Sequence, residues 1–286
     1  MKTFAISLIS SVCVIAALSW PQTSRAQTVP LFQTTFSDAN CAQWTQANGL
    51  GDSNVCQPGD GISGEGAWTA SPGAVEDKIT SVANMAAGGG GKGFRHAVGD
   101  GASNNGGGII LSWTPVAELW MRFYVRYPVG FAFDSADLYS KLVYFNQENP
   151  TNNPHFYWGY HGGATGGYAQ NDGVAQTASS PYTWNGIMGG TTGDGLWHSY
   201  EIHVKMNTGT NDNGVWEWWI DGNLAYSVSN IKFSNNAAGI TWHACAIGEN
   251  FHNPANGGVV FVDFDDIAIS TTGYIGPIGP KNLRVQ

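Results

Sequence analysis

Residues 118–127, "ELWMRFYVRY", alternate between apolar side chains and side chains that are aromatic or positively charged. Successive side chains of a β-strand point to opposite faces of the sheet. One face therefore receives the apolar set, which consists of Leu119, Met121, Phe123 and Val125. The other face receives Trp120, Arg122, Tyr124 and Arg126. We predict that the first set is buried and that the second set is open to a ligand.

The segment 197–207, "WHSYEIHVKMN", divides in the same way. It places Tyr200, Ile202, Val204 and Met206 inward, and it places Glu201, His203 and Lys205 outward. Further strands are predicted at residues 107–113, 141–146, 155–160, 215–221, 240–247 and 259–269. Short strands separated by Gly-rich and Asn-rich turns predict an all-β sandwich or barrel.

Three glycine-rich segments are predicted to be turns or loops: "AAGGGGKG", "GDGASNNGGG" and "YHGGATGGYAQNDGV". The one weak helical pattern consists of Val75, Ile79, Val82 and Met85.

The first 26 residues have the pattern of a cleaved secretory signal. Lys2 precedes an apolar run from residue 4 to residue 18, and small residues at Ser24 and Ala26 suit a signal peptidase. We expect one domain over residues 27–272, a C-terminal tail over 273–286 that leads away from it, and a secreted or periplasmic location. No other stretch approaches the roughly 20 apolar residues of a membrane-spanning helix.

Without the signal, 10 basic residues stand against 21 acidic ones. An acidic surface disfavours nucleic acid and anionic membranes as partners. We expect a monomer.

Cys41 and Cys56 lie close together in a segment rich in Gly, Asn and Asp. In an oxidising compartment they are expected to form a disulfide. Cys245, in "TWHACAIGEN", is expected to be buried and free. No CxxC or HxxxH spacing accompanies these cysteines, so no zinc site is predicted.

Three segments resemble jelly-roll proteins of the concanavalin A-like type. Residues 119–142 resemble a strand, turn and lysine of polysaccharide lyases that cut alginate and glucuronan. Residues 204–226 resemble a hairpin of the same lyases. Residues 259–270, "VVFVDFDDIAIS", are similar to the final strand of concanavalin-like sandwiches. The resemblance implies a jelly-roll β-sandwich of two antiparallel sheets. It also implies β-elimination on a uronic acid polymer, with Lys141 at the position of the lyase lysine.

Such an elimination needs a group that neutralises the sugar carboxylate, a base and an acid. Arg122 or Arg126 is the candidate to hold the carboxylate, and Lys141 or His161 is the candidate base. The candidate acid is Tyr144 or Tyr160. Since Leu142 and Tyr144, or Val143 and Phe145, suit the core equally, the phase of the Lys141 strand stays open.

Aromatic and polar side chains on sheet faces suit sugar rings. The segment "NPHFYWGYHGG" adds two histidines and four aromatic residues to this set. The candidate substrate-binding residues are Trp120, Tyr124, Arg126, Tyr144, Tyr157 and His203. No cofactor is expected, except that analogy to the resembling family suggests a structural calcium at Asp263, Asp265 and Asp266.

Four functions remain open at this point. The first is a polysaccharide lyase, and the second is a noncatalytic, lectin-like carbohydrate-binding protein. The third is a glycoside hydrolase on a neutral glucan, for which Glu201 and Glu217 are the available carboxylate pair. The fourth is a purely structural surface protein.

Overall fold

A computed structural model describes residues 31–37, 62–64, 77–85, 91–98, 108–132, 139–147, 155–161, 164–171, 174–176, 192–234, 241–248 and 260–277. Within residues 62–64, 139–141, 146–147, 155–161, 164–171 and 174–176, only the backbone is described. Cys41 and Cys56 lie outside the described residues, so their pairing remains a prediction.

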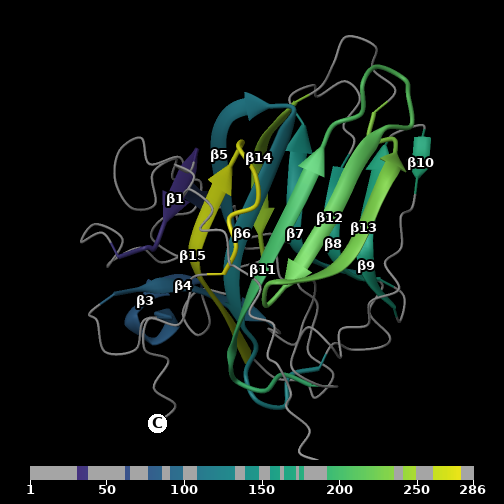
Figure 1. Ribbon diagram of the computed structural model, residues 1–286. Coiled ribbons are helices and arrows are strands. Elements are labelled where there is room, and N and C mark those ends of the chain that lie inside the picture. Colours follow the sequence, from purple (N-terminus) through teal and green to yellow (C-terminus); the bar gives the residue numbers. More distant parts are fainter. Residues whose placement is uncertain are drawn as a thin grey trace, which may run out of the picture.

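The described strands form two antiparallel sheets that lie face to face (Figure 1). Sheet A has the order β13-β12-β11-β6-β15-β4-β3, and β1 also pairs with β15. Its strands are β1 (Phe32–Thr34), β3 (Lys78–Thr80), β4 (Gly93–Val98), β6 (Glu118–Arg126), β11 (Trp197–Lys205), β12 (Gly214–Ile220), β13 (Asn223–Ile231) and β15 (Val260–Ser270).

Sheet B has the order β10-β9-β8-β7-β14-β5-β2. Its strands are β2 (Ile62–Gly64), β5 (Ile109–Val116), β7 (Tyr139–Gln147), β8 (His155–His161), β9 (Ala164–Asn171), β10 (Val174–Gln176) and β14 (Trp242–Ile247). In Figure 1, β11, β12 and β13 of sheet A lie in front of β7, β8 and β9 of sheet B. The all-β sandwich prediction is therefore confirmed.

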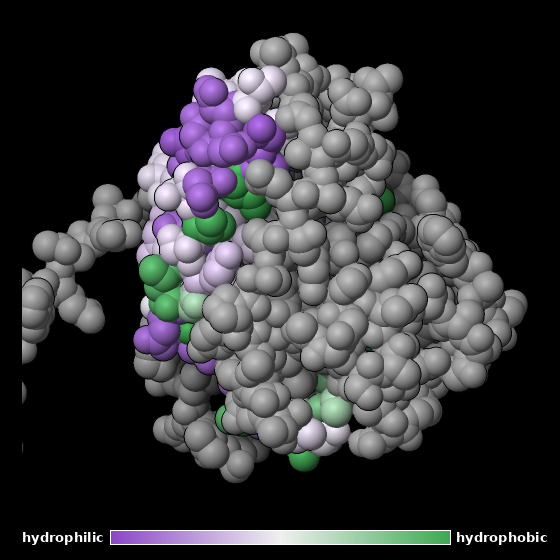
Figure 2. Space-filling model, turned by 90° about the vertical axis from the view of Figure 1, so that its right-hand side faces the viewer, coloured by the Kyte–Doolittle hydropathy of each residue, from purple (hydrophilic) through white to green (hydrophobic). Residues whose placement is uncertain are grey.

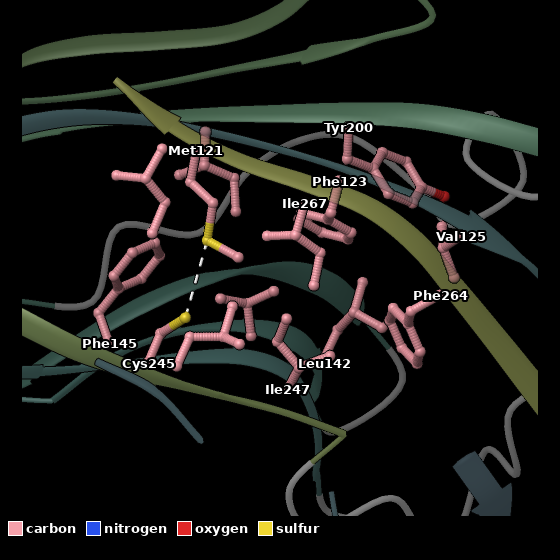
Figure 3. Packing of buried hydrophobic residues seen from close by; sticks show 14 of the residues in the cluster. Met121, Phe123, Val125, Leu142, Phe145, Tyr200, Cys245, Ile247, Phe264 and Ile267 are labelled. Atoms are coloured by element: carbon pink, nitrogen blue, oxygen red, sulfur yellow. Dashed lines mark hydrogen bonds between the residues drawn. The ribbon is translucent and has the colours of Figure 1, made fainter. Parts of the chain in front are cut away.

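The core lies between the inner faces of the two sheets. The predicted core residues of sheet A are all buried, and these are Leu119, Phe123, Ile202, Val204 and Ile220. They are buried because the alternation of β6, β11 and β12 sends them to one face. Sheet B contributes Leu142, Val143, Phe145, Cys245 and Ile247. Figure 3 shows side chains of the two sheets meeting across this layer, with the Cys245 thiol 3.7 Å from the Met121 sulfur.

A tight turn joins β12 to β13. Asp221 has a φ of 49° and Gly222 a φ of 78°. Two consecutive residues with positive φ are typical of the two-residue hairpin turns whose twist matches that of the strands, and Asp-Gly favours this conformation. The Asp221 amide also donates to the Ser199 carbonyl at 2.8 Å, which ties the turn to β11.

β13 is an edge strand of sheet A, and it carries polar side chains. An edge strand without such residues can pair with a strand of another molecule. Figure 2 shows the side of the molecule where β13 lies, and hydrophilic side chains there alternate with small hydrophobic patches. Asn223, Ser227, Ser229 and Asn230 are exposed along this strand. Polar side chains on an edge strand oppose association with another sheet.

Several sequence-based assignments are wrong. The segment predicted as the loop "YHGGATGGYAQNDGV" contains β9 and the first residue of β10, and the strand β13 was not predicted. The weak helical pattern instead covers β3 and the 3-10 turn η2 (Ser81–Ala83). Pairing with neighbouring strands overrides weak local signals at these places.

No helix among the described residues is long and apolar enough to cross a membrane.

Cys245 is predicted to resist alkylation in the folded protein. Burial raises the pKa of its thiol well above the ordinary value, so almost no thiolate is present at neutral pH. Iodoacetamide should label the Cys245 peptide only after denaturation, as measured by peptide mass spectrometry. Rapid labelling of native protein at this peptide would show that the core around β14 opens readily.

Candidate functional site

Arg122 lies on the outer face of sheet A, the face turned away from the core, but it is not open to solvent. Its relative exposure is 6%. Its Nη2 donates to Asp266 Oδ1 at 2.9 Å, and its Nη1 donates to the Gly276 carbonyl at 3.1 Å. The guanidinium is therefore held by groups of the chain itself.

Glu201 pairs with Arg122 across the β11–β6 register and binds the same C-terminal segment. Its carboxylate accepts hydrogen bonds from the amides of Ile275, at 2.6 Å, and Gly276, at 2.7 Å. The Tyr274 ring packs on the Trp219 ring with centroids 4.8 Å apart. Residues 274–277 thus form a strap over sheet A, and the prediction that the tail leads away after residue 273 is wrong for this part.

Arg126 shares the buried carboxylate of Asp263 with Arg95 of β4. Arg95 binds Asp263 through Nε at 2.6 Å and Nη2 at 2.9 Å. Arg126 binds it through Nη2 at 2.6 Å and Nε at 3.2 Å, and its guanidinium lies 4.8 Å from the centre of the Trp197 ring. One carboxylate therefore joins β4, β6 and β15.

Trp120 stacks on His203, with ring centroids 4.1 Å apart and an angle of 4° between the planes. The two ring nitrogens of His203 contact Glu217 at 2.8 Å and Glu118 at 3.0 Å. The four side chains form one cluster across β6, β11 and β12.

The row Trp120, Arg122, Tyr124 and Arg126 does share the face opposite the core, but the prediction of an open face is wrong for Arg122 and Tyr124, which are both buried. Alternation fixes the face of a side chain and not what covers that face. Here β15 supplies aspartates and the strap supplies a carbonyl. Glu201 and Glu217 are likewise occupied by the strap and by His203 and Ser227, and they do not face one another across a groove.

The three aspartates that suggested calcium are used otherwise. Asp263 and Asp266 bind arginines, and Asp265 accepts hydrogen bonds from the amides of Met85 and Asp266, each at 2.7 Å. Burial raises the pKa of Asp265 to about 7 despite these two hydrogen bonds. Among the described residues, no three His, Cys, Asp or Glu side chains are arranged to hold a metal ion.

Tyr144 belongs to the outer face of sheet B and, with a relative exposure of 8%, is as buried as Arg122 and Tyr124 are on sheet A. It packs with Ala246 and Ile110, in a cluster separate from the main core. The β7–β8–β9 register aligns Tyr144 with Tyr157 and Tyr168. Each of the three strands thus contributes one tyrosine position to a single row.

Two further rows follow along β7, β8 and β9. Lys141 is opposite Gly159, which is opposite Gly166. Tyr139 is opposite His161, which is opposite Ala164. A β-bulge between Lys141 and Val143 accounts for the ambiguous phase of this strand, because Leu142 and Val143 both enter the core. Tyr160 is opposite Ser140, one residue away from the positions that form these rows.

The arrangement of the sheets agrees with solved structures. A variant of alginate lyase Aly36B in complex with alginate trisaccharide matches with a TM-score of 0.53 at 14% sequence identity, over 85% of this chain and 99% of that chain. The fold is a concanavalin A-like jelly roll.

Two further jelly-roll structures are more distant in their TM-scores. The endo-beta-1,4-glucuronan lyase from the fungus Trichoderma reesei has a TM-score of 0.48 at 11% identity, over 85% of this chain and 96% of that chain. Alginate lyase vAL-1 from Chlorella virus has a TM-score of 0.46 at 14% identity, over 74% of this chain and 93% of that chain. No protein-family model and no curated protein matches the sequence.

Arg122 is predicted to stabilise the jelly roll. Arg122→Ala leaves Asp266 buried and unpaired and should lower the free energy of unfolding by about 3–5 kcal/mol. Lys205→Ala, which removes an exposed cation paired with Glu118, should cost about 0.2–1 kcal/mol. Urea unfolding of both variants measures the difference. Equal stabilities would show that Arg122 is not a structural residue.

His198 is predicted to make the stability depend on pH. Its pKa is raised, first by the hydrogen bond to Asp221 at 2.8 Å and also by Asp194, against an opposing effect of burial. A raised folded-state pKa gives a contribution that is complete below the unfolded value of about 6.5 and is lost as the pH rises through the folded value. The difference in unfolding free energy between the wild type and His198→Gln should therefore shrink from pH 6 to pH 9. A difference that does not change with pH contradicts the prediction.

Proposed function

We propose that this protein cleaves a uronic acid polymer by β-elimination, on the outer face of sheet B. The observation that carries the proposal is the row Lys141–Gly159–Gly166, which lies between the tyrosine row and the row that contains His161. Glycines in strand interiors are typical of places where a ligand approaches the backbone closely.

The register supports one common face for these positions. Cross-strand partners project to the same side of a sheet, and positions two residues apart along a strand do so as well. Tyr144 is on the outer face, so the positions of Tyr157, Gly159 and His161 are assigned to that face, together with Lys141 opposite Gly159. The same rule gives Tyr160 the opposite face.

Small residues of β14 lie next to the proposed site, on the other side of β7 from β8. Ala246 is opposite Tyr144, and Ala244 is opposite Asn146. Tyrosine rings beside small residues suit a pyranose, because the apolar face of the sugar packs on a ring while its hydroxyls bind polar groups.

The chemistry then divides among three side chains. A cation beside the carboxylate stabilises the charge that develops when the base removes the proton from the adjacent carbon. The electron pair of that C–H bond forms the new C=C bond, the glycosidic C–O bond breaks, and the acid protonates the leaving oxygen. We assign the acid to Tyr144, and the cation and the base to Lys141 and His161.

The two arginines first considered for the carboxylate have no part in this proposal. Arg122 and Arg126 belong to the outer face of sheet A, on the opposite side of the sandwich from Tyr144. An acidic polysaccharide as the substrate is supported by the shared fold of an alginate lyase whose structure contains an alginate trisaccharide. We further propose that the protein is secreted, on the basis of the signal pattern in residues 1–26.

The experiment is incubation with a panel of alginate, glucuronan and neutral glucans, following the ultraviolet absorbance of unsaturated products and total reducing ends. Tyr144→Phe removes only the phenolic hydroxyl and should slow cleavage by about 10²–10⁴-fold while binding persists. Tyr226→Phe, on the edge strand β13 of sheet A, is the matched control and should cleave at the wild-type rate.

The pH dependence separates the two assignments of the base. If His161 is the base, kcat/KM should rise with pH as a histidine loses its proton, and His161→Gln should remove that limb. If Lys141 is the base, the limb lies higher and survives in His161→Gln. Binding without any cleavage would instead support a lectin-like protein. Reducing ends from a neutral glucan without ultraviolet-absorbing products would support a hydrolase.

A further inference from the structure

A surface pocket lies beside Arg126 on the outer side of sheet A, away from the proposed cleavage site. Its volume is about 380 Å³, within the range of small-molecule sites. Two arginines, an aspartate and an apolar wall line it, and the residues important here are Arg95, Arg126, Asp263, Val260, Phe261 and Pro128.

The pocket carries net positive charge. Arg95 and Arg126 share the single carboxylate of Asp263, which leaves one positive charge unbalanced. The Lys78 ammonium does not line the pocket but lies near it, 5.7 Å from the centre of the Phe261 ring. The whole chain has a formal net charge of −9, so these cations form a local exception that an anion can use.

Both guanidiniums retain hydrogen-bonding capacity toward the pocket. Arg126 uses Nε and Nη2 for Asp263 and the Val82 carbonyl, and Arg95 uses Nε and Nη2 for Asp263. The Nη1 groups of both arginines donate no hydrogen bond to the part of the chain that the structure describes. The Arg95 side chain is 19% exposed and the Arg126 side chain is 26% exposed. Guanidinium groups of this kind bind carboxylates with strong, directional hydrogen bonds.

An apolar wall stands next to these donors. The Phe261 ring lies 5.1 Å from the Arg95 guanidinium, which holds the ring against β4. Val260 and Pro128 complete the wall. A carboxylate with a hydroxylated ring attached can contact both parts of such a pocket, whereas a small inorganic anion contacts only the arginines.

We propose that this pocket is a second carbohydrate site, which binds the carboxylate of a uronic acid residue through Arg95 and Arg126 and its ring through Phe261. The choice of a sugar acid rests on the proposed function; the anion-binding geometry does not. The site lies on the opposite face of the sandwich from the tyrosine row, so a polymer held there is not in position to be cleaved. Its role would be to retain acidic polysaccharide near the enzyme.

The test is titration of the full-length protein with sodium glucuronate, glucose and sodium acetate, observed by two-dimensional NMR. The amides of Gly195 and Phe261 report the pocket, and those of Tyr144 and Gly159 report sheet B. Glucuronate should give saturable shifts at Gly195 and Phe261, and glucose should give none. The two sets of signals separate failure of this proposal from failure of the cleavage proposal.

Variants identify the groups responsible. Arg126→Gln should weaken glucuronate binding at the pocket about tenfold or more, because it removes charge-assisted hydrogen bonds. Arg126→Lys should recover only part, since an ammonium cannot bind Asp263 through two nitrogens, as the guanidinium does, and also present a third nitrogen to the ligand. Phe261→Ala keeps every ion pair of Asp263 and should still weaken glucuronate binding. Lys205→Gln, at the far end of β11, is the control and should bind as the wild type does.

Three results overturn the proposal. The first is the absence of saturable shifts at the pocket amides. The second is equal binding in the wild type and in both Arg126→Gln and Phe261→Ala. The third is equal affinity for acetate and glucuronate, which would show that the ring contributes nothing and that the sugar acid is not the ligand class.

Discussion

The ion pairs between β6 and β15 are the interaction on which the outer face of sheet A depends. Asp263 and Asp266 of β15 meet Arg126 and Arg122 of β6, and the carboxylates are almost fully buried. Buried charges destabilise a fold unless they are paired and hydrogen-bonded. The two strands therefore have one satisfactory register, and the bulge between Asp265 and Ala268 brings Asp266 to Arg122 within it.

The strap follows from the same arrangement. Arg122 binds the Gly276 carbonyl while Glu201 binds the Gly276 amide, so one peptide segment of the C-terminal region satisfies a cation and an anion at once. The strap covers the middle of sheet A and leaves Arg126 at its margin, where the pocket lies. The chain itself thus covers Arg122 and Glu201 on this face, and the proposed cleavage site is assigned to the other sheet.

Local sequence was enough to predict strands whose two faces differ strongly in polarity. The strands β6, β11 and β12 alternate apolar residues with charged or aromatic ones, and their core residues are buried as predicted. The environment of Arg122 could not be predicted in this way, because Asp266 and Gly276 lie more than a hundred residues away along the chain. Contacts of that range depend on topology, which alternation within one strand does not specify.

The proposed site on sheet B shows a different limit of sequence patterns. β9, "ATGGYAQN", was assigned to a loop because glycines have low β-propensity and contribute no side chain to a periodic pattern. Because glycines have no side chain to alternate between the faces, a strand that contains Gly166 and Gly167 lacks the periodic signal by which strands are recognised. The bulge in β7 has a similar effect, since it sends Leu142 and Val143 into the core together and hides the phase of Lys141. Strand pairing supplies what the pattern lacks: once Tyr144 is fixed on the outer face, the register assigns every neighbouring position to a side.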